Sequence, residues 1–263
     1  MDLAQAIILG LIQGFSEWLP ISSTAHLRIA EHFLGLTVTP LFNIALHVGT
    51  LVVVVFYFRK DIKNILSDLV RLNFKSESGQ LIPLIVVATI PTAIIGLFYV
   101  EFLEDTLQTI LAMGVAFLVG AAFVYASKTG KENRDIITYG MALVIGAAQG
   151  FAIFPGLSRS GTTISSALLL GVKREKAFKF SFLLSIPAIL GDLIVEAYKQ
   201  HAQLAAQGIG SAELLAGVVA ATIAGYIAIK IVSKTVATKK FHYFSIYTSL
   251  LGATLIILAL IGF

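Results

Sequence analysis

Residues 13–26 read QGFSEWLPISSTAH, and this polar stretch interrupts an otherwise apolar region near the start of the chain. Proline stops a helix because it lacks an N–H and clashes with the preceding turn, and the serines after it can cap a new helix. The second arm, residues 24–36, rises less than about 20 Å, which is short of the ~30 Å hydrocarbon core of a bilayer. We therefore interpret residues 2–36 as a re-entrant helical hairpin broken at 20–23.

A second break of the same kind, PGLS at 155–158, lies within residues 136–172. Its second arm, residues 161–172, is also too short to cross a bilayer. Irregular backbone at membrane depth is tolerated only where it is buried in protein or faces water. Residues 136–172 are therefore expected to form a second re-entrant hairpin.

The composition of the whole chain requires lipid as its solvent. Hydrophobic residues make up 57% of the 263 residues and charged residues only 13%, whereas a soluble domain carries about 25% charged residues. There are no cysteines, which excludes disulfides and thiolate metal sites. Six stretches are near the ~20 residues that a spanning helix needs: 39–58, 80–99, 107–127, 178–198, 211–232 and 243–262. The predicted fold class is an all-α integral membrane protein.

Basic residues gather in short loops between the apolar stretches. They lie at 59–75, at 128–134, at 173–179 and at 234–240, which six crossings place on one side of the membrane. The positive-inside rule makes that side cytoplasmic, so both termini are expected on the opposite, outer side of the membrane. The net charge of +4 is thus a topology signal, and no nucleic-acid partner is expected.

The two halves of the chain resemble each other. The recurring segments are GLIQGF at 10–15 with GAAQGF at 146–151, and VVATI at 86–90 with VAATI at 219–223. We infer two repeats, residues 1–135 and 136–263, each a hairpin followed by three crossings. Because three is odd, the second repeat is inverted, an architecture in which broken helices form a site near the membrane midplane.

Polar residues of the first hairpin form a candidate catalytic group. Gln13 and Glu17 are four residues apart and share a helix face, and Ser23 and His26 are three apart on the next helix. Glu17 has a structural alternative, an ion pair with Arg28 or Arg159, but an ionisable residue inside a membrane is a functional candidate by default. Beside Glu17 and Ser23, a catalytic role for His26 is favoured over a purely structural one.

The second hairpin carries a candidate phosphate site. Arg159 lies between Ser158 and Ser160 at a predicted helix N-terminus, where free N–H groups, the helix dipole and a guanidinium all favour a phosphate. The hydroxyls of Ser22, Ser158, Ser160 and Thr163 are substrate-binding candidates that also fit a capping or packing role. His47, in the first span, is interpreted as a packing residue.

These residues resemble a known family, the bacitracin-resistance class of undecaprenyl-diphosphate phosphatases. Its first motif, E/Q-G-x-x-E-x-x-P-x-S-S-T-x-H, stands at 13–26, and its second, P-G-x-S-R-S-G, stands at 155–161 and is followed by Thr163. A third feature, L-H-x-G-T, stands at 46–50. The resemblance covers essentially the whole chain and departs from the usual pattern at Gln13, Ser16 and Ala25, where many members carry Glu, Thr and Gly.

The resemblance implies removal of the terminal phosphate from a C55 isoprenyl diphosphate, which recycles the lipid carrier of peptidoglycan synthesis and confers bacitracin resistance. It also implies a divalent cation, Mg²⁺ or Ca²⁺, for which Glu17 is the candidate ligand. Gln13 is not a carboxylate, so a site built on two acids in this motif is in doubt. We expect Arg159 to clamp the diphosphate, and Ser23, His26 or an activated water to be the nucleophile.

Two other functions compete with a phosphatase. A transporter or flippase for a prenyl-phosphate lipid fits the inverted repeat and would use Arg159 to bind the headgroup without cleaving it. An ion channel is disfavoured because no ring of like charges is visible in the sequence. The expected partners are the lipid diphosphate and the bilayer, and a homodimer is left open.

Overall fold

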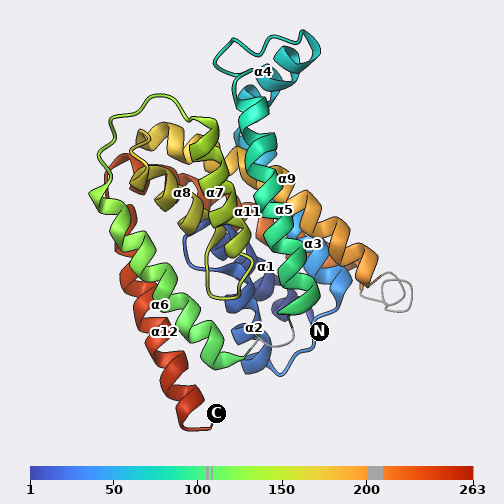
Figure 1. Ribbon diagram of the computed structural model, residues 1–263. Coiled ribbons are helices and arrows are strands. Elements are labelled where there is room, and N and C mark those ends of the chain that lie inside the picture. Colours follow the sequence, from blue (N-terminus) through green and yellow to red (C-terminus); the bar gives the residue numbers. More distant parts are fainter. Residues whose placement is uncertain (105–106, 108, 201–209, 263) are drawn as a thin grey trace.

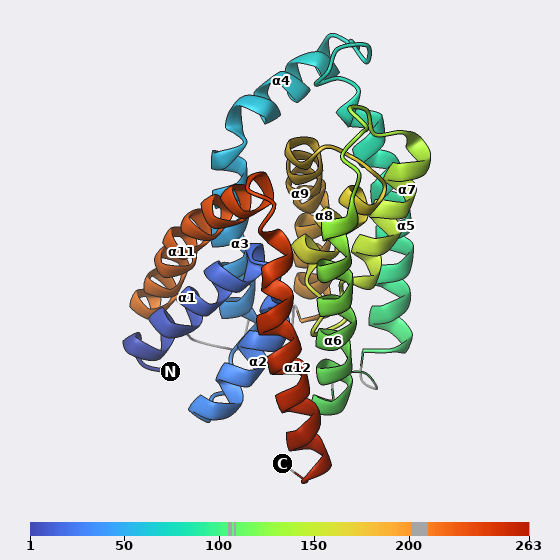
Figure 2. The same ribbon diagram turned by 90° about the vertical axis from the view of Figure 1, so that its left-hand side faces the viewer.

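Six spanning helices and two broken helical pairs make up the computed structural model, which describes residues 1–104, 107, 109–200 and 210–262 (Figures 1 and 2). The α-helices are α1 (Leu3–Trp18), α2 (Ser23–Leu34), α3 (Pro40–Tyr57), α4 (Arg59–Val70), α5 (Leu81–Phe102), α6 (Ile110–Ala126), α7 (Tyr139–Phe151), α8 (Arg159–Leu169), α9 (Arg174–Lys199), α11 (Ser211–Ala237) and α12 (Phe244–Leu260). Short 3-10 turns, η1 (Ser127–Thr129) and η2 (Phe241–Tyr243), adjoin α6 and α12. The predicted all-α class is confirmed.

The six helices long and apolar enough to cross a membrane are those that the sequence predicts. They are α3, α5, α6 with η1, α9, α11 and α12 with η2. Each begins and ends within a few residues of its predicted bounds, and α9 starts four residues early at Arg174. The basic stretch after the first span forms α4, which contains no buried residue.

Both predicted breaks separate short helices. The chain turns between α1 and α2 and between α7 and α8, and the second arms have 12 and 11 residues, about 18 and 16 Å at ~1.5 Å per residue. Two predicted details are wrong. First, α8 begins at Arg159 rather than 161, because the Ser158 hydroxyl caps it by accepting the Gly161 N–H. Second, neither Ser22 nor Ser23 caps α2 through its side chain, because the Ser22 hydroxyl accepts the Gly156 N–H of the second break and the Ser23 hydroxyl donates to Glu17 of α1.

Small residues bring the hairpins close to spanning helices of the other half. A Cβ on Gly14 of α1 would lie 2.7 Å from the Ala224 Cβ of α11, and one on Gly146 of α7 would lie 2.6 Å from the carbonyl carbon of Ala88 in α5. In lipid, helices associate through such close packing rather than through a hydrophobic driving force. The contacts α1–α11 and α5–α7 thus hold each hairpin against the second span of the other half.

Ion pairs hold α9 to the loop before α7 and to α4 at the end of the molecule that carries α4. The Arg174 Nε lies 2.8 Å from a Glu132 carboxylate oxygen, and the Lys179 Nζ lies 2.7 Å from Asp61 of α4. Both chain ends lie away from α4 (Figure 1). The compartment that each end faces, the re-entrant course of the hairpins and the inverted repeat stay predictions.

Candidate active site

The buried carboxylate of Glu17 is the centre of the site. It lies in the last turn of α1 with only 7% of the residue exposed. Its Oε2 accepts hydrogen bonds from Gln13 Nε2 at 3.1 Å and from Ser23 Oγ at 2.7 Å, and its Oε1 accepts one from Arg159 Nη1 at 3.3 Å. Behind it, the Trp18 ring stacks on Phe182 of α9 with centroids 5.1 Å apart, which fixes the end of α1.

The two breaks bond to each other and thereby bring Ser23 and Arg159 to the same carboxylate. Ser22 has φ +69°, a left-handed conformation, and its Oγ accepts the Gly156 N–H of the second break at 3.0 Å. In return, Ser158 Oγ donates to the Leu19 carbonyl of the first break at 3.3 Å. These reciprocal bonds between residues more than 130 positions apart set the distance between the two hairpins.

Arg159 is more accessible than Glu17. It stands in the first turn of α8, and its side chain is 24% exposed, compared with 4% for that of Glu17. Thr163 Oγ1 donates to the Arg159 carbonyl at 2.8 Å, and Ser160 Oγ lies 3.2 Å from Ser158 Oγ. Thr163 and Ser160 therefore stabilise the start of α8. The Arg159 guanidinium lines two spaces, a polar chamber and an apolar pocket.

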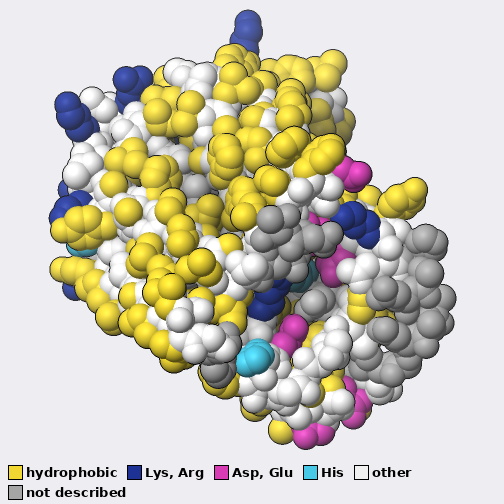
Figure 3. All heavy atoms as spheres, turned by 60° about the horizontal axis from the view of Figure 1, so that its bottom comes forward, with side chains coloured by type: hydrophobic (Ala, Val, Ile, Leu, Met, Phe, Trp, Pro, Cys, Tyr) yellow, Lys and Arg dark blue, Asp and Glu magenta, His cyan; other side chains and the backbone are white. Residues whose placement is uncertain are grey.

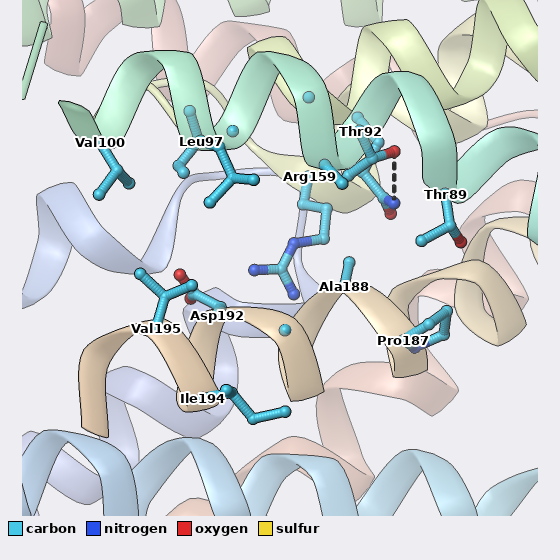
Figure 4. Close-up of a pocket in the computed structure, with 16 residues that line it drawn as sticks. Thr89, Thr92, Leu97, Val100, Arg159, Pro187, Ala188, Asp192, Ile194 and Val195 are labelled. Carbon is cyan, nitrogen blue, oxygen red and sulfur yellow. Dashed lines mark hydrogen bonds between the residues drawn. The ribbon is translucent and has the colours of Figure 1, made fainter. Parts of the chain in front are cut away.

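Two spaces adjoin Arg159. A small chamber of about 50 Å³ is lined by polar groups of both hairpins, including Ser16, Glu17, Ser22, Ser23, Ser158 and Arg159. A larger, mainly apolar pocket of about 350 Å³ lies between α5 and α9, and Arg159 and Asp192 line both spaces (Figure 4). The end of the molecule opposite α4 is hollowed, and basic, acidic and histidine side chains lie together there (Figure 3).

His26 faces away from the carboxylate. Its Nδ1 lies 2.7 Å from the Ser22 carbonyl and its Nε2 lies 2.7 Å from the Tyr247 hydroxyl of α12. Its ring stacks on Tyr247 and packs edge-on against Phe117. Both ring nitrogens are engaged, and His26 does not line the chamber.

Two residues of the site were missed by the sequence analysis. His47 of α3, interpreted as a packing residue, has its Nε2 3.8 Å from Glu17 Oε2. Asp192 of α9 lines the chamber and the pocket. Asp192 could have been found from the sequence, because an acidic residue within a membrane span is a functional candidate. His47 could have been found because it belongs to the third feature of the family, L-H-x-G-T.

A divalent cation would have to bind at the carboxylates of this site. Among the described residues, no group of three or more His, Cys, Asp or Glu side chains is placed to hold a metal ion. An all-protein metal cage therefore does not fit. Mg²⁺ is usually held by one or two carboxylates together with substrate phosphates, and the carboxylates of Glu17 and Asp192 at the chamber fit that mode.

The chain is similar to known proteins along its whole length. A family model described as bacitracin resistance protein BacA matches residues 6–254. An undecaprenyl-diphosphatase of Carboxydothermus hydrogenoformans is 39% identical over 100% of this chain and 99% of its own. Those of Korarchaeum cryptofilum (38%; 97% of this chain, 99% of that one) and Bacillus cereus (undecaprenyl-diphosphatase 3; 39%, 98% of each) are comparably similar. The matched regions include both hairpins.

Proposed function

This chain belongs to the bacitracin resistance protein BacA family, and we propose that it hydrolyses undecaprenyl diphosphate at the centre formed by Glu17, Ser23 and Arg159. The products are undecaprenyl phosphate and inorganic phosphate, which returns the lipid carrier to cell-wall synthesis and fits the family's name. The observation that carries this assignment is the junction of the two breaks, where one carboxylate accepts hydrogen bonds from a serine and an arginine.

Arg159 is placed to hold the terminal phosphate. Its guanidinium has five N–H donors, and the structure uses Nη1 for a single 3.3 Å bond to Glu17 among the described residues. Arginine binds phosphate oxygens bidentately, and such charge-assisted donors stabilise the charge that shifts onto those oxygens in the transition state. The apolar pocket next to Arg159 suits the lipid portion of the same substrate.

Glu17 is placed to accept the proton of the nucleophile. Ser23 Oγ already donates to Glu17 at 2.7 Å, within the range expected for a general base and its nucleophile. In the serine route, Oγ bonds to the terminal phosphorus, the bond from phosphorus to the bridging oxygen breaks, and undecaprenyl phosphate leaves. Water then hydrolyses the phosphoserine to free phosphate. In the alternative route Glu17 activates a water directly, and Ser23 only positions it.

The geometry favours Ser23 over His26 as the nucleophile. His26 has both ring nitrogens bonded and lies outside the chamber, whereas the Ser23 hydroxyl opens onto it. We assign His26 a positioning role, because its bond to the Ser22 carbonyl holds the residue beside Ser23.

A divalent cation, Mg²⁺ or Ca²⁺, is proposed to arrive with the diphosphate, with Glu17 as its main protein ligand and Asp192 as the second carboxylate of the chamber. When bound, the cation neutralises phosphate charge. The protein is proposed to lie in the bacterial inner membrane with both termini outside, so that the site opens toward the outer face.

The decisive experiment is phosphate release from undecaprenyl diphosphate by the purified protein in detergent, with Mg²⁺ or Ca²⁺ present. We expect turnover by the wild type and none by Ser23→Ala, while Ser166→Ala, a buried serine of α8 bonded to its own helix, stays active. The competing flippase predicts substrate binding without phosphate release. Trapping of ³²P on the wild type but not on Ser23→Ala distinguishes the serine route from direct attack by water.

A further inference from the structure

A groove runs from Arg159 outward between α5 and α9. Its inner part is the pocket of about 350 Å³, and a second hollow of about 570 Å³ continues it toward the ends of the two helices, sharing Leu97, Val100, Ile194 and Val195 with the first. Leu97 is 57% exposed and Ile194 is 69% exposed. In a membrane these side chains face lipid, whereas Glu101 and Lys199 line the second hollow at the helix ends.

The polar and apolar parts of the groove are separated along its length. Figure 4 shows the Arg159 guanidinium projecting between α5 and α9, with Leu97, Val100 and Val195 toward one end of the pocket. Near the other end, Gln149 Nε2 donates to Thr92 Oγ1 at 3.2 Å. Along the pocket, Arg159 and Asp192 thus lie between a polar end at Thr92 and an aliphatic end (Figure 4), which suits an amphiphile whose anionic headgroup binds at Arg159.

Two glycines on the facing helices give the groove its width. A Cβ on Gly191 of α9 would meet nothing within 4 Å, and one on Gly96 of α5 would meet only the Ile153 Cδ1 at 3.8 Å. Both glycines line the pocket. Leucine at either position would thus project into the groove rather than into packed protein.

The corresponding contact in the other half of the molecule is closed. There α3 packs on α11, as α9 faces α5, and Thr222 Oγ1 approaches the Gly49 carbonyl at 3.4 Å. A Cβ on Gly49 would lie 3.1 Å from the Val218 carbonyl oxygen. Gly49 therefore lacks the open space found at Gly96 and Gly191, and the opening between α5 and α9 lies on the side that Arg159 reaches.

We propose that this groove seats the first isoprene units of the substrate's prenyl chain, and that Gly96 and Gly191 determine how well long-chain diphosphates are accepted. The proposal rests on the diphosphatase activity assigned above. A volume of about 350 Å³ is at the lower end of ~300–1,000 Å³ for ligand pockets, so it holds the part of the chain next to the diphosphate. The remainder stays in lipid.

The groove acts through alignment rather than through hydrophobic transfer. Lipid is as apolar as the groove wall, so moving the chain between them yields little free energy. The chain's direction instead fixes where the diphosphate lies relative to Arg159 and Ser23, and misplacement by about 1 Å can cost ~100-fold in rate. Filling the groove is expected to displace the headgroup of a long substrate and to leave a short one undisturbed.

The test compares isopentenyl, farnesyl and undecaprenyl diphosphates with Gly96→Leu, Gly191→Leu and the milder Gly96→Ala. Gly140→Leu is the matched control, because Gly140 lies in α7 outside the groove and a Cβ there meets nothing within 4 Å. We expect both leucine variants to lower kcat/KM for undecaprenyl diphosphate roughly tenfold or more, the scale of overpacking a fitted apolar site. The kcat/KM for isopentenyl diphosphate should change less than about twofold, because its short chain does not reach the overpacked part of the groove.

Each outcome separates the two proposals. The groove assignment is overturned if the leucine variants retain the wild-type dependence of kcat/KM on chain length. It is also overturned if they lose activity equally on all three substrates while Gly140→Leu does not. A wild type that hydrolyses none of the three substrates overturns the diphosphatase assignment instead. If the leucine variants fold poorly, Gly96→Ala serves instead, because its single added carbon fits without a clash. It should lower kcat/KM for undecaprenyl diphosphate in the same direction but by a smaller factor.

Discussion

A carboxylate is stable inside this protein because donors surround it. Glu17 accepts hydrogen bonds from Gln13, Ser23 and Arg159, and His47 stands 3.8 Å from its Oε2. An ion taken out of water without such partners costs several kcal/mol. The side chains that permit burial of Glu17 thus include the groups that are proposed to act on the substrate.

Glu17→Gln is predicted to abolish turnover and to leave the protein folded. Glutamine keeps the shape and can still accept from Ser23, but it removes the base and the counter-charge of Arg159. We expect a loss of at least ~100-fold, the lower range for removal of a general base. Phosphate release and thermal unfolding in detergent should be measured together, and a variant with substantial activity would contradict the assigned role.

Gln13→Glu is predicted to make the enzyme more dependent on the divalent cation. The substitution replaces a donor 3.1 Å from Glu17 Oε2 by a second carboxylate, and like charges at that distance repel. A bound cation offsets the repulsion, since additional anionic oxygens favour a hard ion. Activity titrated with Mg²⁺ should fall at low concentration and recover at high concentration. Equal activity at every concentration would show that Gln13 does not face the cation.

Arg159→Lys is predicted to lose activity roughly tenfold or more, the scale of one to three charge-assisted hydrogen bonds. Lysine retains the charge but lacks the planar fork that binds two phosphate oxygens. Steady-state kinetics should show the loss in kcat/KM. Arg28→Lys, on α2 and outside the chamber, is the control, and near-wild-type turnover by Arg159→Lys would indicate a point charge.

At the scale of elements, the two breaks act as one joint. The Ser22 hydroxyl and the Gly156 N–H join them, and both residues adopt positive φ, +69° and +106°. Serine rarely adopts that conformation, which costs of order 1–3 kcal/mol and persists where the surroundings enforce it. The hydrogen bond across the joint is such a constraint, and it places Ser23 directly after the turn.

Gly156→Ala is predicted to destabilise the joint. A Cβ there would lie 2.6 Å from the Met113 carbonyl oxygen and would add strain at φ +106°, a combination expected to cost roughly 1–3 kcal/mol. Thermal unfolding should shift to lower temperature, and activity should fall because the hairpins separate. Gly140→Ala, in open space, should do neither. A Gly156 variant with unchanged unfolding and activity would show that the joint is dispensable.

At the scale of the whole molecule, the helix contacts pair across the two halves. α1 packs on α11 as α7 packs on α5, α3 faces α11 as α9 faces α5, and α6 packs on α12. The inverted repeat of residues 1–135 and 136–263 stays a prediction, because these contacts show which helices meet and not how the halves are oriented.

The topology prediction is that both termini lie outside and the α4 end inside. Cysteines introduced singly at Arg71 and Asp2 are unique labels, because the chain has no cysteine of its own. On intact cells, a membrane-impermeant maleimide should label position 2 and should reach position 71 only after lysis. Labelling of position 71 from outside would reverse the orientation and place the hollow end in the cytoplasm.

The sequence by itself determined the local features of this protein. The number of spans, their bounds within a few residues, the two breaks and the sharing of one helix face by Gln13 and Glu17 all follow from hydropathy, proline and helical periodicity. These signals act over at most ~20 residues, the length of one spanning helix, so they are legible without knowledge of the packing.

Only the tertiary structure decided which of these elements meet. Glu17 pairs with Arg159, 142 positions away, and gains His47 as a neighbour, while His26 turns to Tyr247 on the last span. Contacts between separate helices depend on how small residues let backbones approach, and this is not encoded in any one segment. The opening between α5 and α9 has the same origin: related helix pairs pack tightly on one side and, where Gly96 and Gly191 face open space, leave a groove on the other.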